Sequence, residues 1–524
     1  MDGSPRGDAP WFLSNQEYHR MYPTGCQPGK LYGLCKVHKP GNPLRPVVSM
    51  VGTSSYELAR YLDRIIKPCI PDAYTCYSTK SFIDRVSSFF FTPDDTLLSF
   101  DVESLFTNVP LKQTIDIIAD YVYKQEQTPP FSKTVFKNMM KWATGGHFLH
   151  NDKLYTQVDG VAMGSPLGPT LANFFLGHLE STVLFQSHAA DGLNGYPRFY
   201  IRYVDDIFCV FNVDFNNFLD RLNNLHPNLR FTYELWDNGR LPFLDTEIYI
   251  DNGNFKSWVY RKKTNTNVVL NAFALCPSVW KTGVFVGSLH RAWTICSTRE
   301  LFLEEVNKLR QIFIKNGYVS SYLNKLVKQF LLKKDSAAGI NNVSNNSDSD
   351  DDDDNVRRYI LVIPFVGKPS LVFKKQLIKI FKEGLDIDLR CVFNSCKVKT
   401  YFSLKSRTPS FLAGNVVYKY TCQHDATQSY IGETTRYLIE RAGEHLDLNA
   451  NPPSAISSHI SSCDTCRDNL KSGNLNVNNF DVIKSCKSKV ECEINEAFLV
   501  KKLSPSMNRQ LFMGGAMHTL RIFG

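Results

Sequence analysis

Long hydrophobic runs are missing from this sequence, because no stretch of 18 or more apolar residues occurs in its 524 positions to span a bilayer. The first ten residues include Asp2, Arg6 and Asp8 and lack the apolar core of a secretory signal. Cysteine is also sparse, and 14 residues are too few for a disulfide scaffold in a chain of this length. We therefore expect a soluble, unexported protein whose cysteines are buried thiols or metal ligands.

The chain is long and basic. Its 524 residues exceed a typical domain of roughly 150 residues several times over, which predicts two to four domains. The net charge is +9, although Asp348 and the run 350–354 contribute six negative charges, so the remainder of the chain carries +15. A folded body with this charge favours a polyanionic partner such as nucleic acid.

A domain boundary is predicted at residues 334–355, which contain almost no large apolar side chain and end in the aspartate run. Such a segment cannot bury enough surface to fold, so we interpret it as a flexible linker. Before it, strand-like runs at 96–102 and 199–210 alternate with helical spacing at 111–125 and 169–184. This mixture predicts an α+β body ahead of the linker.

Acidic residues interrupt the strand-like runs of the body. Asp205 and Asp206 lie between aromatic and β-branched residues in RYVDDIF, and Asp101 lies in SFDVESLF. An Asp-Asp pair on its own most often forms a turn. Two strands that present carboxylates side by side would instead hold a pair of Mg²⁺ ions about 3.5–4 Å apart, the arrangement used in phosphoryl transfer.

The segment between these positions is rich in glycine and proline. Residues 160–173, GVAMGSPLGPTLAN, have a backbone that can approach a substrate closely. In chain order, DVESLF, MGSPLGP and YVDD resemble motifs A, B and C of reverse transcriptases. The segments 30–49, 241–248 and 258–266 look like those of Penelope-like retroelement reverse transcriptases, which are relatives of telomerase.

This resemblance implies a right-hand polymerase. Its fingers and palm would cover 30–279 and a helical thumb-like region would cover 280–333. Family members usually carry a longer amino-terminal region, so we interpret residues 1–29 as a shortened extension. The linker at 334–355 would then separate the polymerase from the rest of the chain.

The resemblance also implies roles for individual residues. Asp101, Asp205 and Asp206 match the family's metal aspartates, which hold two Mg²⁺ ions. Arg45 matches the fingers arginine that contacts the incoming triphosphate. Phe106 lies where the family has an aromatic gate against the ribose 2′-hydroxyl, which suits selection of dNTPs.

Two further features follow from the same resemblance. Gly164 and its neighbours are expected beneath the template and primer. A general-acid lysine for pyrophosphate departure is expected downstream, and both Lys262 and Lys263 qualify.

The part after the linker predicts a small α/β module. Residues 415–421 and 428–432 are strand-like, and 436–448 have helical spacing. Tyr418 and Tyr430 lie on the two strand-like runs. A tyrosine is a poor base unless its pKa falls, which a nearby arginine and a metal-bound water network could achieve.

VVY followed by YIGETTRYLIERAGEH resembles the GIY-YIG endonuclease family, in the version joined to Penelope-like polymerases. The resemblance implies that Tyr418, Tyr430, Gly432 and Arg441 occupy the motif positions. Glu496 would be the carboxylate that holds a single Mg²⁺ ion in the nuclease site.

Three more residues belong to this expectation. Asn508 would close the nuclease site. His445 lies four residues after Arg441 on the same helix face and would contact phosphate or bind metal. Glu493 remains an alternative to Glu496, because both lie on one helical pattern. The endonuclease domain is placed at 411–515, after a connector at 356–410.

A structural Zn²⁺ ion is a further candidate. Cys463 and Cys466 have the two-residue spacing of zinc ligands. Other potential ligands nearby in the sequence are Cys422, His424, His459, Cys486 and Cys492. Buried thiols are the alternative, because no second CxxC supplies the other half of a regular site.

The two modules together predict a multifunctional retroelement enzyme. An RNA-directed DNA polymerase would copy an RNA template with dNTPs, and a linked endonuclease would nick a DNA target to supply the 3′-hydroxyl primer. No membrane partner is expected, and a chromosomal substrate implies a nuclear location. The alternatives are an inactive or domesticated copy that still binds nucleic acid, and a polymerase whose nuclease has decayed.

Overall fold

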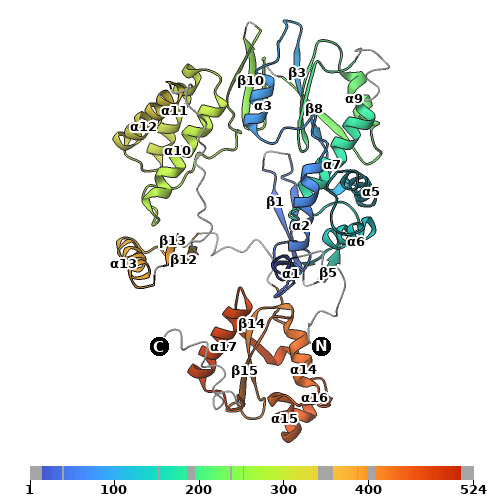
Figure 1. Cartoon of the computed structure of the whole chain (residues 1–524), viewed down its shortest axis with the longest axis vertical. Coiled ribbons are helices and arrows are strands. Elements are labelled where there is room, and N and C mark those ends of the chain that lie inside the picture. The colour runs from blue at the N-terminus through green and yellow to red at the C-terminus, as the bar shows by residue number, and fades with distance from the viewer. Residues whose placement is uncertain are drawn as a thin grey trace.

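The computed structural model describes residues 14–37, 40–151, 153–185, 195–236, 239–251, 253–339, 358–385, 387–395, 397 and 408–508. In these ranges the chain forms a mixed α/β body, a three-helix region, a small βαβ unit and a carboxy-terminal α/β module (Figure 1). Among the described residues, no helix is both long and apolar enough to cross a membrane.

The body is built on three sheets, with strand orders β2-β1-β4-β5, β6-β7-β3-β8 and β11-β10-β9. Its strands are β1 (Gly29–Cys35), β2 (Leu44–Ser49), β3 (Thr96–Val102), β4 (His147–His150), β5 (Lys153–Thr156), β6 (Phe199–Tyr203), β7 (Asp206–Phe211), β8 (Phe231–Leu235), β9 (Arg240–Phe243), β10 (Thr246–Asp251) and β11 (Asn254–Val259). Its helices are α1 (Asn15–Met21), α2 (Tyr56–Ile66), α3 (Thr79–Val86), α4 (Leu105–Asn108), α5 (Leu111–Val122), α6 (Lys133–Thr144), α7 (Gly168–Leu179) and α9 (Asn216–Asn223).

Strand β3 lies at the centre of the second sheet and pairs antiparallel with β7 on one side and β8 on the other. The predicted strand at 96–102 is therefore confirmed. The predicted single strand at 199–210 is wrong in one respect, because it is a hairpin of β6 and β7. The chain reverses at Val204, which has a φ of 55°.

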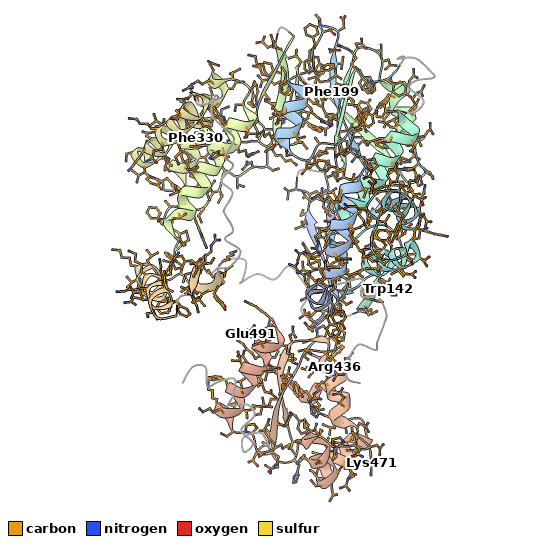
Figure 2. The ribbon with its side chains drawn as sticks, in the orientation of Figure 1. Trp142, Phe199, Phe330, Arg436, Lys471 and Glu491 are labelled. Carbon is orange, nitrogen blue, oxygen red and sulfur yellow. The ribbon has the colours of Figure 1, made fainter. Side chains whose placement is uncertain are left out.

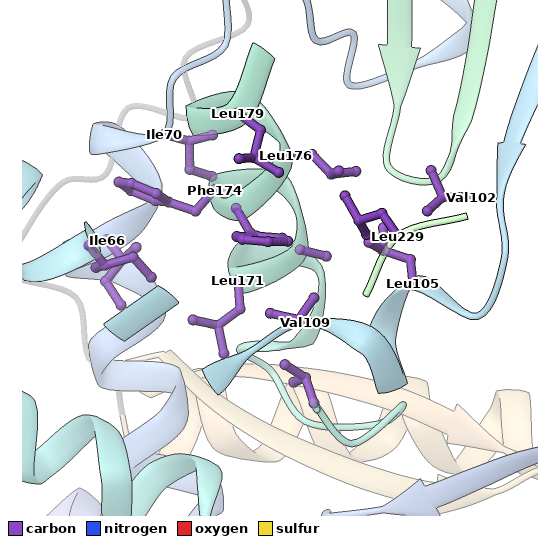
Figure 3. Close-up of a cluster of buried hydrophobic side chains, with 14 of the residues drawn as sticks. Ile66, Ile70, Val102, Leu105, Val109, Leu171, Phe174, Leu176, Leu179 and Leu229 are labelled. Carbon is purple, nitrogen blue, oxygen red and sulfur yellow. The ribbon is translucent and has the colours of Figure 1, made fainter. Parts of the chain in front are cut away.

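Helix α7 forms the centre of the largest hydrophobic core. It is buried on almost every side, unlike an amphipathic surface helix. Figure 3 shows Leu171, Phe174 and Leu179 of this helix between Ile66 on one side and Val102 on the other. The predicted helix at 169–184 is confirmed, although its last residues, Glu180–Leu184, are π-helical. The Gly-rich loop that precedes α7 is thus anchored to a rigid helix.

The three-helix region consists of α10 (Ser278–Ile295), α11 (Arg299–Lys315) and α12 (Ser320–Gly339). These helices share a separate core that includes Phe285, Leu289 and Phe313. The Thr298 side chain caps α11 by accepting a hydrogen bond from the backbone amide of Leu301. Helix α12 continues to Gly339, so the predicted linker does not begin at residue 334. Residues 340–355 of that linker lie outside the described residues.

The predicted connector contains a βαβ unit. Strands β12 (Arg358–Pro364) and β13 (Asp388–Asn394) are parallel, and α13 (Lys368–Leu385) connects them. A small core of Ile363, Leu389 and Cys391 packs against the helix. This unit lies between the three-helix region and the carboxy-terminal module along the chain.

The carboxy-terminal module has a three-stranded sheet of order β15-β14-β16, in which β14 is central and buried. Its strands are β14 (Val416–Thr421), β15 (Ser429–Thr434) and β16 (Phe480–Ser485). Its helices are α14 (Leu438–Leu446), α15 (Ala455–Ser462), α16 (Asp464–Lys471) and α17 (Lys489–Leu503). The strand-like and helical runs predicted here are thus confirmed to within a few residues.

The module contacts the body through the segment before β1. The backbone amide of Gly25 donates a hydrogen bond of 2.7 Å to the carbonyl of Thr435. Trp142 of α6 and Tyr437 of the module line a small cleft at this junction. Figure 2 labels Trp142 and Arg436 on the two sides of the contact.

Candidate active sites

Three aspartates converge at one end of the central sheet. Asp101 in β3 pairs in register with Asp206, the first residue of β7. Asp205 lies in the hairpin turn, and its carbonyl accepts a hydrogen bond of 3.1 Å from the amide of Val102. All three aspartates line the same cleft of about 1190 Å³. The fold thus brings together residues that are 104 positions apart in the sequence.

The carboxylates of this cluster repel one another. Burial and the charges of Asp205 and Asp101 raise the pKa of Asp206 to about 7. Burial also raises the pKa of Asp205, whereas the charges of Arg45 and Lys36 oppose that rise. Carboxylate oxygens are the ligands that Mg²⁺ prefers, and a bound cation would remove the repulsion. The donor set therefore fits divalent metal ions.

Basic residues face the same cleft. Arg45 lies on β2 and lines the cleft together with Lys262 and Lys263, which follow β11. The charge of Lys262 lowers the pKa of Asp206 against the larger effects that raise it. This charge interaction supports Lys262 as a candidate general acid, and Lys263 lines the same cleft.

Phe106 lies where the cleft meets a second cavity of about 710 Å³, and Gly164 lies in the wall of that second cavity. Phe106 is half-buried and lines both spaces. Gly164, which lines the second cavity, has a φ of 141°, and a Cβ there would lie 2.4 Å from the carbonyl oxygen of Val48. Only glycine fits at this point, because the loop before α7 packs directly against β2.

In the carboxy-terminal module, Tyr418, Arg441 and His445 form one hydrogen-bonded group. The hydroxyl of the buried Tyr418 lies 2.7 Å from Nε2 of His445. The same hydroxyl accepts a hydrogen bond of 3.3 Å from Nε of Arg441. Arg441 and His445 are four residues apart on α14, so both reach the sheet from one helix face.

Gly432 separates the two tyrosines. The ring centroids of Tyr418 on β14 and Tyr430 on β15 are 6.4 Å apart. A Cβ on Gly432 would lie 2.7 Å from the Tyr418 hydroxyl and 2.6 Å from the Tyr430 ring. Glycine is therefore required here for the tyrosines to approach each other.

Asn508 acts on the backbone of strand β15. Its side chain is buried, accepts a hydrogen bond of 2.8 Å from the amide of Ile431 and donates one of 2.6 Å to the carbonyl of Ile431. The predicted residue Asn508 thus fixes the strand that carries Tyr430 and Gly432.

Glu496 on α17 is the carboxylate that faces the tyrosines. Burial and the charge of Glu433 raise the pKa of Glu496 to about 7, and Arg441 opposes this rise. Its own charge raises the pKa of Tyr430. Glu493, the alternative, is exposed and forms an ion pair of 3.7 Å with a lysine one helical turn away. Its burial and its charge interaction with Tyr430 therefore favour Glu496 over the exposed Glu493.

Glu433 is a carboxylate beside Glu496 that the sequence analysis missed. One of its oxygens, Oε2, is buried and has no hydrogen-bond partner among the described residues. The position of Glu433 directly after Gly432 could have marked it as a candidate site residue. Its closeness to Glu496 on α17, however, arises only in the tertiary fold.

The protein groups around Tyr418 and Tyr430 do not lower the pKa of either tyrosine, contrary to the expectation from the sequence. Burial raises the pKa of Tyr418 and of Tyr430, because the loss of water around a phenolate outweighs the attraction of Arg441. Burial and Arg441 lower the pKa of His445 to about 4. His445 is therefore neutral at physiological pH and can accept a hydrogen bond from Tyr418.

Four potential metal ligands meet at another point of the module. The ligand atoms of Cys422, His459, Cys463 and Cys466 all lie within 4.8 Å of one another. The sulfur atoms of Cys422 and Cys466 are 3.4 Å apart, and Cys466 Sγ is 3.8 Å from Nε2 of His459. Three thiolates and an imidazole form a common tetrahedral zinc set. Cys486, one of the other cysteines considered, contacts Cys492 instead.

Two buried charged residues near the aspartates were also missed. Arg202 on β6 is fully buried and forms an ion pair of 2.6 Å with Glu180, which follows α7. The signal was an arginine in an otherwise apolar strand, since such a residue requires a buried partner. A single sequence does not reveal which residue that partner is.

Comparisons with known protein families find matches for two segments of the chain. Residues 37–225 match the family of reverse transcriptases (RNA-dependent DNA polymerases). Residues 268–328 match the animal helix-turn-helix domain. No curated protein sequence matches the chain.

Several solved polymerase structures are similar at low identity. Telomerase from Candida albicans, in complex with a fragment of telomeric RNA, is 10% identical over 60% of this chain and 56% of that chain, with a TM-score of 0.40. Apo telomerase from Candida tropicalis is 11% identical over 60% and 59%, with a TM-score of 0.36. The RNA-dependent RNA polymerase of a human picobirnavirus is 11% identical over 61% and 62%, with a TM-score of 0.39. The chain spans less than two thirds of each of these structures.

The aspartate cluster and the family match coincide. Asp101, Asp205, Asp206, Arg45 and the Gly-rich loop all lie within the matched residues 37–225. The chain therefore carries a polymerase domain of the reverse transcriptase type. The predicted resemblance to reverse transcriptases is thus supported for residues 37–225, about a third of the chain.

Proposed function

We propose that this protein is the polymerase of a Penelope-like retroelement and copies an RNA template with dNTPs. The observation that carries this proposal is the convergence of Asp101, Asp205 and Asp206 in one cleft of a reverse transcriptase domain. Two Mg²⁺ ions bound to such a cluster would activate the primer 3′-hydroxyl and neutralise the leaving pyrophosphate.

The residues of the chain then position the substrates. Arg45 binds the incoming triphosphate, to which its guanidinium donates hydrogen bonds. Phe106 leaves no room for a ribose 2′-hydroxyl and so selects dNTPs. Lys262 protonates the pyrophosphate as it departs, and the backbone at Gly164 contacts the template and primer. The position of all four at the walls of two adjoining cavities supports these roles.

We further propose that the carboxy-terminal module is a GIY-YIG endonuclease. It would nick a DNA target, and the resulting 3′-hydroxyl would prime the polymerase. The support is the group formed by Tyr418, Tyr430, Arg441, His445 and Glu496 around one point of the module. One Mg²⁺ ion held by Glu496 would act as a Lewis acid on the scissile phosphate.

The protein groups of the proposed nuclease site have separate tasks. Arg441 stabilises negative charge on the phosphate. The hydrogen bond between His445 and Tyr418 orients the tyrosine hydroxyl in the site. Asn508 and Gly432 keep strand β15 in the position that allows the two tyrosines to meet.

We also propose a structural Zn²⁺ ion at Cys422, His459, Cys463 and Cys466. The support is the mutual distance of the four ligand atoms. Such an ion would join the end of β14 to α15 and α16 and stabilise the module. The proposed partners of the whole protein are an RNA template and a DNA target with its primer, and a chromosomal target implies a nuclear location.

Incorporation of dNTPs on a primed RNA template with Mg²⁺ tests the polymerase proposal. The wild-type chain should incorporate dNTPs, and Asp205→Asn should lose this activity because a metal ligand is removed. Asp220→Asn on the exposed side of α9 is a matched control and should remain active. A folded wild type that binds RNA but incorporates nothing would contradict the proposal and favour an inactive copy.

Nicking of supercoiled plasmid DNA with Mg²⁺ tests the endonuclease proposal. Glu496→Gln should abolish nicking, whereas Glu493→Gln on the exposed face of the same helix should not. Asp205→Asn should nick as well as the wild type, because it alters only the polymerase site. A wild type that polymerises but does not nick would instead favour a polymerase with a decayed nuclease.

A further inference from the structure

We infer that Arg202 is a positioning residue that sets the geometry of the metal-binding hairpin in the polymerase site. The inference rests on the proposed polymerase function. It concerns a buried network beneath the aspartates that links the hairpin of β6 and β7 to helix α7.

All three nitrogen atoms of the Arg202 guanidinium donate hydrogen bonds. Nε and Nη2 donate to the two oxygens of Glu180 at 2.6 and 2.9 Å. Nη1 donates to the side-chain oxygen of Asn173 at 2.8 Å, and Nη2 also donates to the hydroxyl of Thr75 at 3.1 Å. Nη1 additionally donates to the carbonyl of Val204 at 3.1 Å. This last bond connects the network to the turn that presents Asp205 and Asp206.

The turn at Val204 requires such support. Val204 is β-branched and has a φ of 55°, a conformation that only a few per cent of non-glycine residues adopt. Strain of this kind persists only where the surrounding structure over-determines the backbone. The hydrogen bond from Arg202 to the Val204 carbonyl holds the strained peptide group between the two strands. If this bond is lost, the turn keeps its backbone contacts with β3 but loses the side-chain support that fixes the Val204 peptide and the orientation of the two aspartates.

The network also couples two parts of the polymerase site. Asn173 lies in α7 and Glu180 follows it directly, so both move with the helix that carries the Gly-rich loop. Arg202 therefore fixes the metal-binding turn relative to the loop expected beneath the template and primer. Buried ion pairs are seldom more stable than apolar packing of the same volume. A role in geometry explains the network better than a role in stability.

Direct metal binding tests this inference. The full-length protein, free of nucleic acid, is titrated with Mn²⁺ and the free ion is followed by electron paramagnetic resonance. The binding lost in Asp205→Asn is taken as the polymerase site. Arg202→Lys keeps the charge but cannot reach Glu180, Asn173 and Val204 at once. Mutation of a residue that orients metal ligands typically weakens affinity about 10-fold or more, and that loss is expected here.

Amide hydrogen exchange supplies a second readout, and Tyr200→Phe is the matched control. In Arg202→Lys, peptides that contain residues 203–206 should exchange faster, while the centre of β3 stays protected. Tyr200 donates a hydrogen bond of 2.6 Å to Glu180, whereas Arg202 bonds both Glu180 and the carbonyl of Val204 in the turn. Tyr200→Phe should therefore lower stability without changing Mn²⁺ affinity or exchange at the hairpin.

The outcomes separate this inference from the proposed function. A folded Arg202→Lys with wild-type Mn²⁺ affinity and hairpin exchange overturns the inference, whether or not the wild type polymerises. If Arg202→Lys does not fold, Asn173→Ala decides, because it removes one partner of Nη1 without unpairing a charge. Weaker Mn²⁺ binding in Asn173→Ala supports the inference, and unchanged binding overturns it. A wild type that binds Mn²⁺ but incorporates no dNTPs contradicts only the proposed function.

Discussion

Replacement of Asp206 by asparagine should stabilise the metal-free protein while it removes polymerase activity. Burial and two neighbouring carboxylates raise the pKa of Asp206 from 3.8 to about 7. The folded protein thus binds this proton more tightly than the unfolded chain does, so stability is lost as pH rises from about 4 to about 7. The full loss of folding stability caused by the charged Asp206 is present above pH 7, and the loss is small at pH 4. Asparagine has a similar shape and carries no charge, so it should remove the cost.

The size of the effect follows from the shift. A rise of about 3 pH units corresponds to about 4 kcal/mol, at about 1.4 kcal/mol for each unit. Asp206 is only partly buried, so solvent screening reduces the expected gain in the free energy of unfolding to about 2 kcal/mol. For a domain of about 150–250 residues this corresponds to a rise in melting temperature of about 4–8 °C.

Thermal unfolding of the full-length protein in EDTA measures this gain. Asp206→Asn should melt at a higher temperature than the wild type at pH 8, and most of the difference should disappear at pH 4. Saturating Mg²⁺ at pH 8 should also narrow the difference, because cations stabilise only the wild-type cluster. The control Asp220→Asn should change stability by less than about 0.5 kcal/mol. An Asp206→Asn protein that melts at or below the wild-type temperature at pH 8 would refute the proposed repulsion.

Three further predictions concern other parts of the chain. Metal analysis should find one Zn²⁺ per wild-type chain and much less in Cys466→Ser; equal content would contradict the zinc site. Gly432→Ala should destabilise the carboxy-terminal module by about 1–3 kcal/mol, because the added Cβ overlaps Tyr418. The control Gly443→Ala lies in open space on α14 and should not destabilise the module, and thermal unfolding of the two variants tests this difference. Gly164→Ala should lower dNTP incorporation but preserve plasmid nicking, because its Cβ overlaps the β2 backbone; full incorporation would disprove this close approach.

The sequence predicted the elements whose patterns are local. The strand at 96–102 was predicted because a central strand is buried on both faces, so its apolar run is nearly continuous. The reversal within 199–210 was expected only as the turn that an Asp-Asp pair often forms, and the part of Val204 in it was not predicted, because valine is not a turn residue and its conformation is imposed by tertiary contacts. The extent of α12 was missed because Lys334 and two alanines, which favour helices, were interpreted as part of a polar linker.

Site residues, too, were predicted where their signal is local in the sequence and were missed where it depends on tertiary contacts. Asp101, Asp205 and Asp206 were found because carboxylates contradict an apolar strand pattern and recur in ordered motifs. The partner of Arg202 was not found, because Glu180 lies 22 positions away on a different element. Cys422 and His459 were noted only as neighbours in sequence, since the distances that join them to Cys466 arise from the packing of β14 against α15 and α16.

The two candidate sites share one electrostatic arrangement. In each, burial and neighbouring carboxylates raise the pKa of one acidic group to about 7, at Asp206 in the polymerase and at Glu496 in the module. Cation binding at either group would release a proton and would strengthen as pH rises toward 8. His445, with a pKa of about 4, and Tyr418, with a raised pKa, do not titrate in this range. A common dependence of polymerisation and nicking on pH between about 6 and 8 would therefore be assigned to the carboxylates.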